Sequence, residues 1–361
     1  MKAAIYSQYL DTLGGGERYI LGIARALSEN GFDVDIEWSS KTVNPKKIWQ
    51  TQAKSKKEVN AINSKDFEKR FGISFDHISF VEDINRGDGY DLCFWVSDGS
   101  IPALKSRRNF LHFQVPFRNV NGKSLINKVK LMRIKEIICN SNFTKSVIDE
   151  EFGVKSVVLY PPVDVEKFKP KRKQNIILYV GRFSQLLQSK GQDVLIENFK
   201  KLVKSGIKDW KLILAGGAEV GADKYLKKLK KLSKGYKVEI VESPSFKEIR
   251  DLYGVAKIFW SASGFGINEM LEPMKVEHFG ITVVEAMSAG ALPIVYAAGG
   301  HKEIIKPGKN GFLWTNESDL IEITSKLIQD EKLLRSFKSK MQESSKKYSH
   351  ENFEENFLKL I

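Results

Sequence analysis

A chain of 361 residues is too long for one ordinary hydrophobic core and suits two domains that each bury their own apolar interior. With 42% hydrophobic and 28% charged residues, its composition is that of a soluble globular protein. The formal net charge of +14 predicts attraction to polyanions, but it does not choose among nucleic acid, anionic lipid head groups and phosphorylated small molecules.

The sequence contains two cysteines and no apolar run of membrane-spanning length. Cys93 and Cys139 each lie in an apolar, strand-like run, so we expect two buried, reduced thiols and no disulfide. Residues 1–12 lack the long apolar core of a signal peptide, and no apolar run approaches the ~20 residues of a spanning helix. We therefore expect a cytoplasmic protein whose membrane contact, if it has one, is peripheral.

Short β-branched and aromatic runs alternate with helical periodicity along the chain, which is typical of parallel sheets with crossover helices. In the first half we predict strands near residues 3–7, 34–38, 78–81, 92–96, 110–113 and 137–140. The second half repeats the pattern, with strands near residues 176–180, 211–215, 238–241, 258–260 and 292–296. Between the halves, the three prolines of residues 160–173 interrupt helices and ladders alike, so we place the domain boundary there.

Three glycines follow the first predicted strand. Gly14, Gly15 and Gly16 precede a helical run at 17–28, so the backbone there can approach a diphosphate closely. The pattern GGGERY is not G-x-G-x-x-G, which weakens an oxidoreductase interpretation while leaving phosphate binding intact. A tight strand-to-helix turn without a ligand is the alternative.

The segment EHFGITVVEAMSAG places Glu277 and Glu285 eight positions apart around Gly280, which opens a helix. Backbone amides at a helix N-terminus suit a phosphate. The two glutamates offer four carboxylate oxygens that can accept hydrogen bonds from vicinal hydroxyls, as in sugars and ribose. The alternative is an ordinary amphipathic helix on which Glu285 is solvated.

Residues 277–300 resemble the E-x7-E signature and following strand of the group 1 retaining glycosyltransferases, family 4. The variant EHFGI followed by VVEAM is similar to the branch that includes mannosyltransferases of lipid-linked oligosaccharides. Further landmarks of the family occur in its order, namely GGGE at 14–17, SNFT at 141–144, YPPVD at 160–164, GR at 181–182 with KG at 190–191, and NG at 310–311.

The resemblance implies an α/β protein of GT-B fold, with two Rossmann-like domains whose parallel sheets face each other across a cleft. Residues 1–165 would form the N-terminal, acceptor-side domain, and residues 166–348 the C-terminal, nucleotide-sugar-binding domain. Residues 349–361 would form a C-terminal helix that crosses back to the N-terminal domain.

The resemblance also implies roles at the donor site. Glu277 would contact hydroxyls of the donor sugar, Glu285 would contact the ribose, and the amides of Gly280 and Ile281 would meet the phosphate.

Two cations follow one predicted strand, and one histidine lies near the end of another. Arg182 and Lys190 project from the carboxyl edge of the second sheet, and the resemblance implies that they stabilise the donor diphosphate as the sugar departs. His112 resembles the family histidine near the donor sugar, where it would position the sugar or donate a hydrogen bond. The alternative for His112 is a partly buried ring bonded to backbone.

The reaction implied is transfer of a hexose from a UDP- or GDP-sugar, with retention, to a hydroxyl of a glycan or of a polyprenyl-linked glycan. The departing phosphate would take the acceptor proton, so no protein nucleophile is needed. Related GT-B enzymes, such as a phosphorolytic enzyme or a nucleotide-sugar epimerase, are the first alternative. A noncatalytic, basic lipid- or nucleic-acid-binding protein is the second.

No cofactor is expected, because the sequence predicts no metal site. Asp33 and Asp35 have D-x-D spacing but open an early strand, where a solvated strand end is the simpler interpretation. The histidines and cysteines never approach zinc-ligand spacing.

Residues 261–276 depart from the family, where many relatives run directly into the signature. Glycine, proline and methionine in this insertion suit a mobile flap near the donor. Ser261 stands where the most similar branch has histidine, which puts mannose in doubt as the sugar.

Two segments are strongly basic. Residues 105–133 contain no acid, and the helix expected at 124–134 carries an apolar stripe of Leu125, Val129 and Met132. The stripe could lie on anionic lipid, or it could pack on the first domain's own sheet, as helix stripes usually do. In the segment 224–237, leucines point to a core and lysines to solvent. Neither segment resembles a nucleic-acid-binding module.

Overall fold

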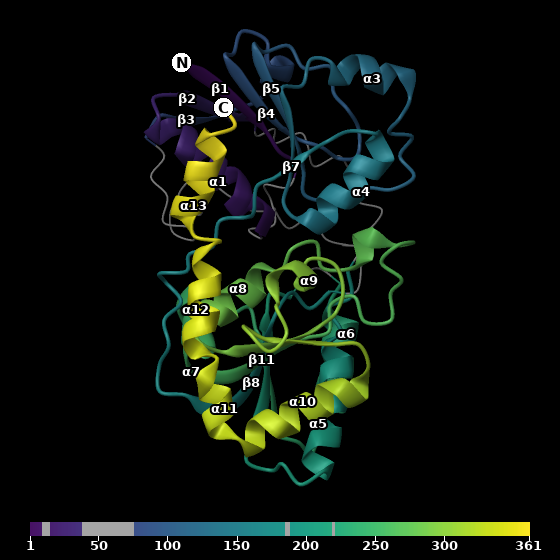
Figure 1. Cartoon of the computed structure of the whole chain (residues 1–361), viewed down its shortest axis with the longest axis vertical. Coiled ribbons are helices and arrows are strands. Elements are labelled where there is room, and N and C mark those ends of the chain that lie inside the picture. The colour runs from purple at the N-terminus through teal and green to yellow at the C-terminus, as the bar shows by residue number, and fades with distance from the viewer. Residues whose placement is uncertain (9–14, 38–75, 185–187, 219–220) are drawn as a thin grey trace. The chain divides into compact units, whose positions relative to one another are not determined.

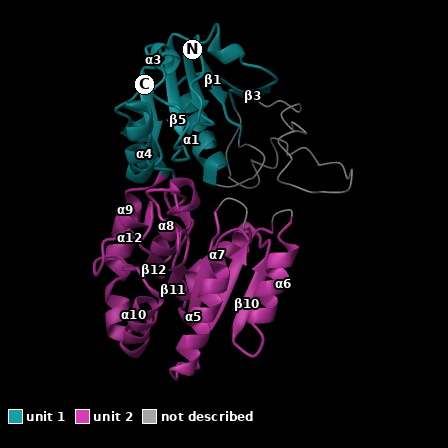
Figure 2. Ribbon diagram, turned by 90° about the vertical axis from the view of Figure 1, so that its right-hand side faces the viewer, with its two compact units in different colours: residues 1–162, 350–361 teal, residues 163–349 magenta. Residues whose placement is uncertain are grey.

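A computed structural model of the chain describes residues 1–8, 15–37, 76–184, 188–218 and 221–361. The described residues form two compact units (Figure 2). Unit 1 comprises residues 1–162 together with 350–361, and unit 2 comprises residues 163–349. Each unit is a parallel sheet with helices on both faces (Figure 1).

The sheet of unit 1 has the strand order β3-β2-β1-β4-β5-β6-β7, and all of its strand pairs are parallel. The strands are β1 (Lys2–Tyr6), β2 (Asp33–Glu37), β3 (Ile78–Val81), β4 (Leu92–Val96), β5 (Arg108–Phe113), β6 (Glu136–Cys139) and β7 (Val157–Val158). The helices are α1 (Gly15–Glu29), the short 3-10 helix η2 (Asn85–Gly87), α3 (Leu125–Leu131), α4 (Asn142–Phe152) and α13 (His350–Leu358).

The sheet of unit 2 has the order β10-β9-β8-β11-β12-β13, again with every pair parallel. The strands are β8 (Gln174–Val180), β9 (Lys211–Gly216), β10 (Val238–Glu242), β11 (Ala256–Ser261), β12 (Leu292–Tyr296) and β13 (Phe312–Trp314). The helices are α5 (Gln192–Lys204), α6 (Asp223–Leu232), α7 (Phe246–Val255), the 3-10 helix η3 (Pro273–Lys275), α8 (Ile281–Ser288), α9 (His301–Ile304), α10 (Glu317–Gln329), α11 (Glu331–Ser336) and α12 (Lys338–Lys346).

Both sheets therefore have the doubly wound order, in which the direction of the crossovers reverses once. The reversal falls between β1 and β4 in unit 1 and between β8 and β11 in unit 2. Loops leave the two central strands toward opposite faces at such a point, so the carboxyl edge there is open to a ligand.

Each predicted strand is present, with its ends shifted by no more than two residues. Strands β7 and β13 were not predicted, because two or three residues are too short to show a period in the sequence. Cys93 and Cys139 are free and buried in β4 and β6, as expected. None of the helices in the described ranges has the length and apolar content to cross a bilayer.

Helix α13 belongs to unit 1, where it packs on α1 (Figure 1). The ring of Phe353 meets Tyr19 edge-on at a centroid separation of 5.2 Å, and Phe357 meets Phe94 in the same way at 6.1 Å. Both phenylalanines are at least 96% buried, so the end of the chain forms part of the core of the unit in which the chain begins.

The alternative in which the stripe of the helix at 124–134 packs on the sheet of unit 1 is wrong. Leu125, Val129 and Met132 are 79%, 66% and 85% exposed, and α3 has no buried residue. In contrast, Leu226 and Leu229 of α6 are buried, which confirms the interpretation of the segment 224–237.

Candidate functional site

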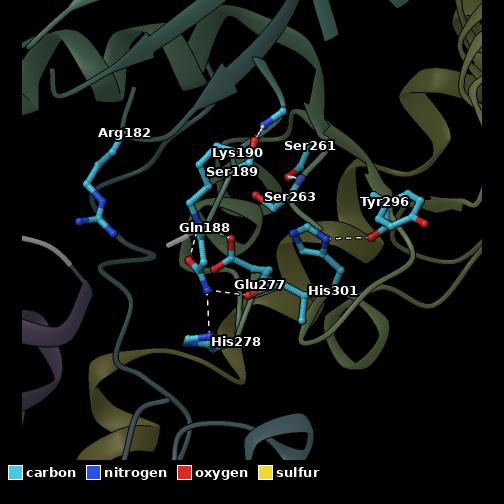
Figure 3. A network of polar contacts seen from close by, with 12 residues as sticks. Arg182, Gln188, Ser189, Lys190, Ser261, Ser263, Glu277, His278, Tyr296 and His301 are labelled. Atoms are coloured by element: carbon cyan, nitrogen blue, oxygen red, sulfur yellow. Dashed lines mark hydrogen bonds and ion pairs between the residues drawn. The ribbon is translucent and has the colours of Figure 1, made fainter. Parts of the chain in front are cut away.

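The polar side chains that the sequence places after β8, β11 and β12 gather at the carboxyl edge of the sheet of unit 2 (Figure 3). Lys190 comes from the loop between β8 and α5, Glu277 from the loop before α8, and His301 from the first turn of α9. This is the edge next to the β8–β11 reversal, where ligands bind in doubly wound sheets.

Lys190 and Glu277 form an ion pair at the centre of this group. The ammonium Nζ of Lys190 lies 2.9 Å from the carboxylate Oε2 of Glu277, and the two side chains are 12% and 20% exposed. Burial alone would raise the pKa of Glu277, but Lys190, His301 and His278 together lower it to about 2. Glu277 is therefore an ionised hydrogen-bond acceptor near neutral pH and not a proton donor.

Gln188 holds Lys190 from the other side. Its side-chain carbonyl accepts a hydrogen bond from Lys190 Nζ at 3.0 Å, and its amide nitrogen donates to the backbone carbonyl of Val276 at 2.6 Å. One glutamine therefore fixes the cation and also joins the β8–α5 loop to the residue before Glu277. Gln188 was not predicted from the sequence, because a lone glutamine in a loop has no characteristic spacing.

His301 lies beside Glu277 and is 1% exposed. Its Nδ1 donates to the carbonyl of Tyr296 at 2.9 Å, since a carbonyl can only accept, which leaves Nε2 as the acceptor of the neutral ring. Burial lowers the pKa of His301 more than the neighbouring carboxylate of Glu277 raises it. The sequence alone indicated no task for this histidine, because its place beside Glu277 comes from a contact between distant loops.

Gly299 and Gly300 let the loop after β12 touch the backbone around Glu277. A Cβ atom at Gly299 would lie 2.1 Å from the carbonyl oxygen of Glu277, and one at Gly300 would lie 2.3 Å from that of Phe279. The amide of Gly300 donates to the Glu277 carbonyl at 2.8 Å. No larger residue fits at either position, so the pair fixes the position of the Glu277 backbone.

Helix α8 begins directly after this contact. Its N-cap, Gly280, has φ 117° and ψ 53°, a backbone conformation that side chains disfavour. Gly280 offers no side-chain oxygen to the first amides of the helix, and the amides of Val283 and Val284 bond its carbonyl. Glu285 lies within α8 and is only 3% exposed, which makes it more deeply buried than a solvated helix residue would be.

Arg182 follows β8 at the same edge of the sheet. Its backbone carbonyl accepts a hydrogen bond from the side chain of Gln192 at 2.9 Å. In Figure 3 the guanidinium group points away from the Lys190–Glu277 pair. The structure thus brings Arg182 and Lys190 to one edge, and the ion pair joins Lys190 to Glu277.

In unit 1, Gly15 and Gly16 open α1 as the glycine-rich turn predicts, whereas Gly14 lies outside the described residues. The side chain of Gln114 contacts this turn, and its amide lies 3.4 Å from the carbonyl of Gly16. Gln114 directly follows β5, so it is a polar residue at the carboxyl edge that the sequence analysis missed.

His112 lies inside the core of unit 1. It is 0% exposed, its ring stacks on Tyr19 with centroids 4.1 Å apart, and Nδ1 bonds the carbonyl of Ile138 at 3.0 Å. Nε2 is buried without a hydrogen-bond partner, and burial lowers the pKa of the ring to about 3. The alternative expected from the sequence was a partly buried ring bonded to backbone, and the ring is in fact fully buried. A contact with a sugar would require the surrounding side chains to move.

Both aspartates of the D-x-D pair contact other side chains of unit 1. Asp33 is exposed and pairs with His77 at 3.3 Å, while Asp35 accepts the hydroxyl of Tyr90 at 2.9 Å. Both open β2, as predicted. Within the described ranges, no three histidine, cysteine or acidic side chains cluster in a way that could hold a metal ion.

The insertion at 261–276 is tied to the site by three contacts. Glu269 accepts a hydrogen bond from the amide of Gly299 at 2.7 Å and pairs with Lys302. Phe265 packs against the rings of both Tyr296 and Trp314, each with a centroid 5.3 Å away. Val276 receives the hydrogen bond from Gln188 described above.

Residues 162–344, just over half of the chain, match the family model described as Glycosyl transferases group 1. The chain belongs to this family. Its two units of parallel sheet are those of the GT-B fold, as the solved structures described below also show.

Among curated relatives, a GDP-Man:Man(3)GlcNAc(2)-PP-Dol alpha-1,2-mannosyltransferase of Dictyostelium discoideum is 28% identical over 61% of this chain and 45% of its own length. The human protein of the same name is 29% identical over 62% and 48%. An uncharacterized glycosyltransferase of Methanocaldococcus jannaschii is 25% identical over 97% of this chain and 95% of its own. The chain thus spans about half the length of these mannosyltransferases and nearly all of the archaeal protein.

Two solved structures share the fold over nearly the whole chain. HepE of Anabaena, solved in complex with UDP and glucose, is 17% identical with a TM-score of 0.72, covering 99% of this chain and 98% of that one. Sucrose-phosphate synthase of Thermosynechococcus elongatus is 16% identical with a TM-score of 0.70, covering 100% and 98%.

The ion pair predicts an acid-sensitive contribution to the stability of unit 2. Because the pKa of Glu277 is lowered from 4.5 to about 2, the ionised carboxylate stabilises the fold above pH 4.5. This contribution is lost as the pH falls toward 2, and it amounts to on the order of 3 kcal/mol. In urea unfolding followed from about pH 3 to pH 6, Glu277→Gln should flatten the pH dependence. Glu272→Gln, an exposed control, should not. Parallel curves for the parent and Glu277→Gln would contradict the pairing.

The contacts of Glu269 predict that it restrains the insertion. Glu269→Ala removes a charged hydrogen bond and an ion pair, so cleavage within residues 262–276 by a protease should rise about tenfold or more. Glu272→Ala is the matched control, since Glu272 pairs only with Lys275 of the same insertion among the described ion pairs. Equal cleavage of the two variants would show that Glu269 does not hold this segment.

Proposed function

We propose that the protein is a retaining hexosyltransferase that moves a sugar from a nucleotide diphosphate sugar to a hydroxyl of a glycan, without a metal ion. The observation that carries the proposal is the fixed Lys190–Glu277 pair beside the uncapped N-terminus of α8. It combines a cation and helix amides, which suit a diphosphate, with a carboxylate that suits sugar hydroxyls.

In this proposal the donor diphosphate meets the amides of Gly280 and Ile281, Lys190 and Arg182. These groups stabilise the negative charge that grows on the phosphate as the glycosidic bond breaks. Glu277 accepts hydrogen bonds from the donor sugar, and Glu285 from the ribose. In unit 1, Gly15 and Gly16 allow the backbone to approach a diphosphate closely, and the buried ring of His112 acts through its neighbours.

The chemistry of Glu277 supports transfer over glycosidase-type hydrolysis. A general acid must hold a proton near neutral pH, and a carboxyl with a pKa of about 2 does not. In the proposed reaction the leaving phosphate, and not Glu277, takes the proton of the acceptor hydroxyl on the face of attack. The two glutamates bind the donor and do not serve as the acid and nucleophile of a retaining glycosidase.

The relatives suggest the substrate class. The names of the mannosyltransferases specify GDP-Man and a dolichyl-diphosphate glycan, and HepE was solved with UDP. We propose a UDP- or GDP-sugar as donor and a polyprenyl-linked glycan as acceptor. The protein would then act on the cytoplasmic face of a membrane as a peripheral enzyme.

The proposal is tested by incubating the protein with UDP- and GDP-sugars, with and without a polyprenyl-diphosphate glycan. Transfer that needs the acceptor, retains the anomeric configuration and persists in a metal chelator supports it. Epimerisation or phosphorolysis without the acceptor supports the related GT-B enzymes instead. If a chelator instead inhibits transfer and magnesium or manganese reverses the inhibition, that result would contradict metal independence and favour a metal site at Asp33 and Asp35.

Arg182→Ala should depress turnover more than donor affinity, because the charge that Arg182 meets grows in the transition state. Removing one such stabilising group costs roughly 100- to 1,000-fold in turnover. Arg172→Ala, at the start of unit 2 and before β8, is the matched control. Steady-state kinetics in which Arg182→Ala loses less than about threefold would rule out this role.

A further inference from the structure

Helix α3 carries a group of exposed, large apolar side chains on unit 1. Leu125, Ile126, Val129 and Met132, here called the α3 patch, are 79%, 69%, 66% and 85% exposed. Elsewhere in the described ranges, only Met1, Met270 and Leu271 are large apolar residues with comparable exposure. More than half of the exposed large apolar side chains thus belong to one short helix.

The four side chains share one face of the helix. At 100° per residue they fall within an arc of about 120°, the width of a face that a helix normally buries. Helix α3 lies at the border of unit 1 in Figure 1. An exposed apolar face of this kind is typical of a surface that binds another molecule.

The helix is held firmly on its polar side. The Ser124 hydroxyl caps its N-terminus, the Asn127 side chain donates to the carbonyl of Gly122 at 3.2 Å, and Lys130 Nζ donates to the carbonyl of Ile101 at 2.9 Å. The preceding turn is anchored by Glu151, whose carboxylate accepts from the amides of residues 119, 120 and 122. The apolar face therefore points outward because of fixed contacts.

The α3 patch lies in a segment of the sequence that has cations and no acids. Lys123, Lys128 and Arg133 are exposed and lie before, along and after the helix. No residue between 99 and 135 is acidic, and none of the ion pairs recorded for the described ranges involves these three cations. A partner that matches the α3 patch must offer both an apolar region for these side chains and negative charge for the cations.

Helix α6 shows that this is not a general property of basic helices in the chain. It is richer in lysine than α3, but its apolar side chains Tyr225, Leu226 and Leu229 are buried. Its lysines are thus the solvated face of a packed helix. In α3 the cations accompany an apolar face that the protein itself leaves uncovered.

We propose that the α3 patch rests on an anionic lipid surface, with its apolar side chains at the level of the acyl boundary and the three cations among the lipid phosphates. A second copy of the chain fits poorly, because a symmetric contact would bring two cationic surfaces together. The inference rests on the proposed function in one respect, in that lipid-linked acceptors lie in such a surface. Vesicle binding itself requires no sugar transfer.

The test is sedimentation of the full chain with vesicles of phosphatidylglycerol and phosphatidylcholine, or of phosphatidylcholine alone. The protein should bind the anionic vesicles at low salt, and this binding should weaken as the salt concentration rises. Lys123→Gln/Lys128→Gln/Arg133→Gln should weaken partitioning on the order of 100-fold, given the contribution of each cation near an anionic surface. Ile126→Ser/Val129→Ser should also weaken it, and since both side chains are exposed the fold should be unchanged.

The matched control is Lys224→Gln/Lys227→Gln/Lys231→Gln in α6, which removes the same charge from exposed lysines and should keep vesicle binding. Equal loss in the two triple variants, no binding by the parent, or full binding by Ile126→Ser/Val129→Ser would each overturn the inference. So would a parent dimer that dissociates when the α3 patch is changed. Transfer of sugar to a lipid-free glycan should be the same in the parent and in all variants. If neither the parent nor any variant transfers sugar, but vesicle binding follows the expected pattern, only the proposed function fails.

Discussion

The ion pair between Lys190 and Glu277 is the interaction on which the arrangement of the candidate site depends. A buried carboxylate costs free energy unless a cation and hydrogen bonds compensate. Here the ammonium of Lys190 provides that compensation, and Gln188 holds the ammonium in place. The pair joins two loops that are far apart in the sequence. It holds a cation and a hydrogen-bond acceptor 2.9 Å apart, beside the start of α8.

The backbone around the pair is as constrained as its side chains. Gly299 and Gly300 allow direct contact between the loop after β12 and the backbone from Glu277 to Phe279. Glu269 then fastens the insertion to the same loop. A donor that enters here would meet groups whose positions are set before it binds, which is the condition for electrostatic stabilisation of a developing charge.

The sequence predicted most of the fold, because buried parallel strands leave a clear pattern of apolar runs. It also indicated Arg182, Lys190, Glu277 and Glu285 as candidates, because they belong to recognisable motifs. It could not reveal Gln188, His301 or Glu269, since their importance comes from contacts between loops that are distant in the chain. The stripe of α3 was ambiguous for a related reason. Periodicity shows that a helix has an apolar face, but only the tertiary structure shows whether the protein covers it.

The central claim is that the Lys190–Glu277 pair and the first amides of α8 form the donor site. A crystal structure of the protein with a UDP- or GDP-sugar that it binds tests this claim most directly. The account predicts the diphosphate at the amides of Gly280 and Ile281 and within hydrogen-bonding distance of Lys190 Nζ, with sugar hydroxyls on the carboxylate of Glu277. A nucleotide sugar bound elsewhere, with the Lys190–Glu277 pair intact and out of contact with it, would contradict the account.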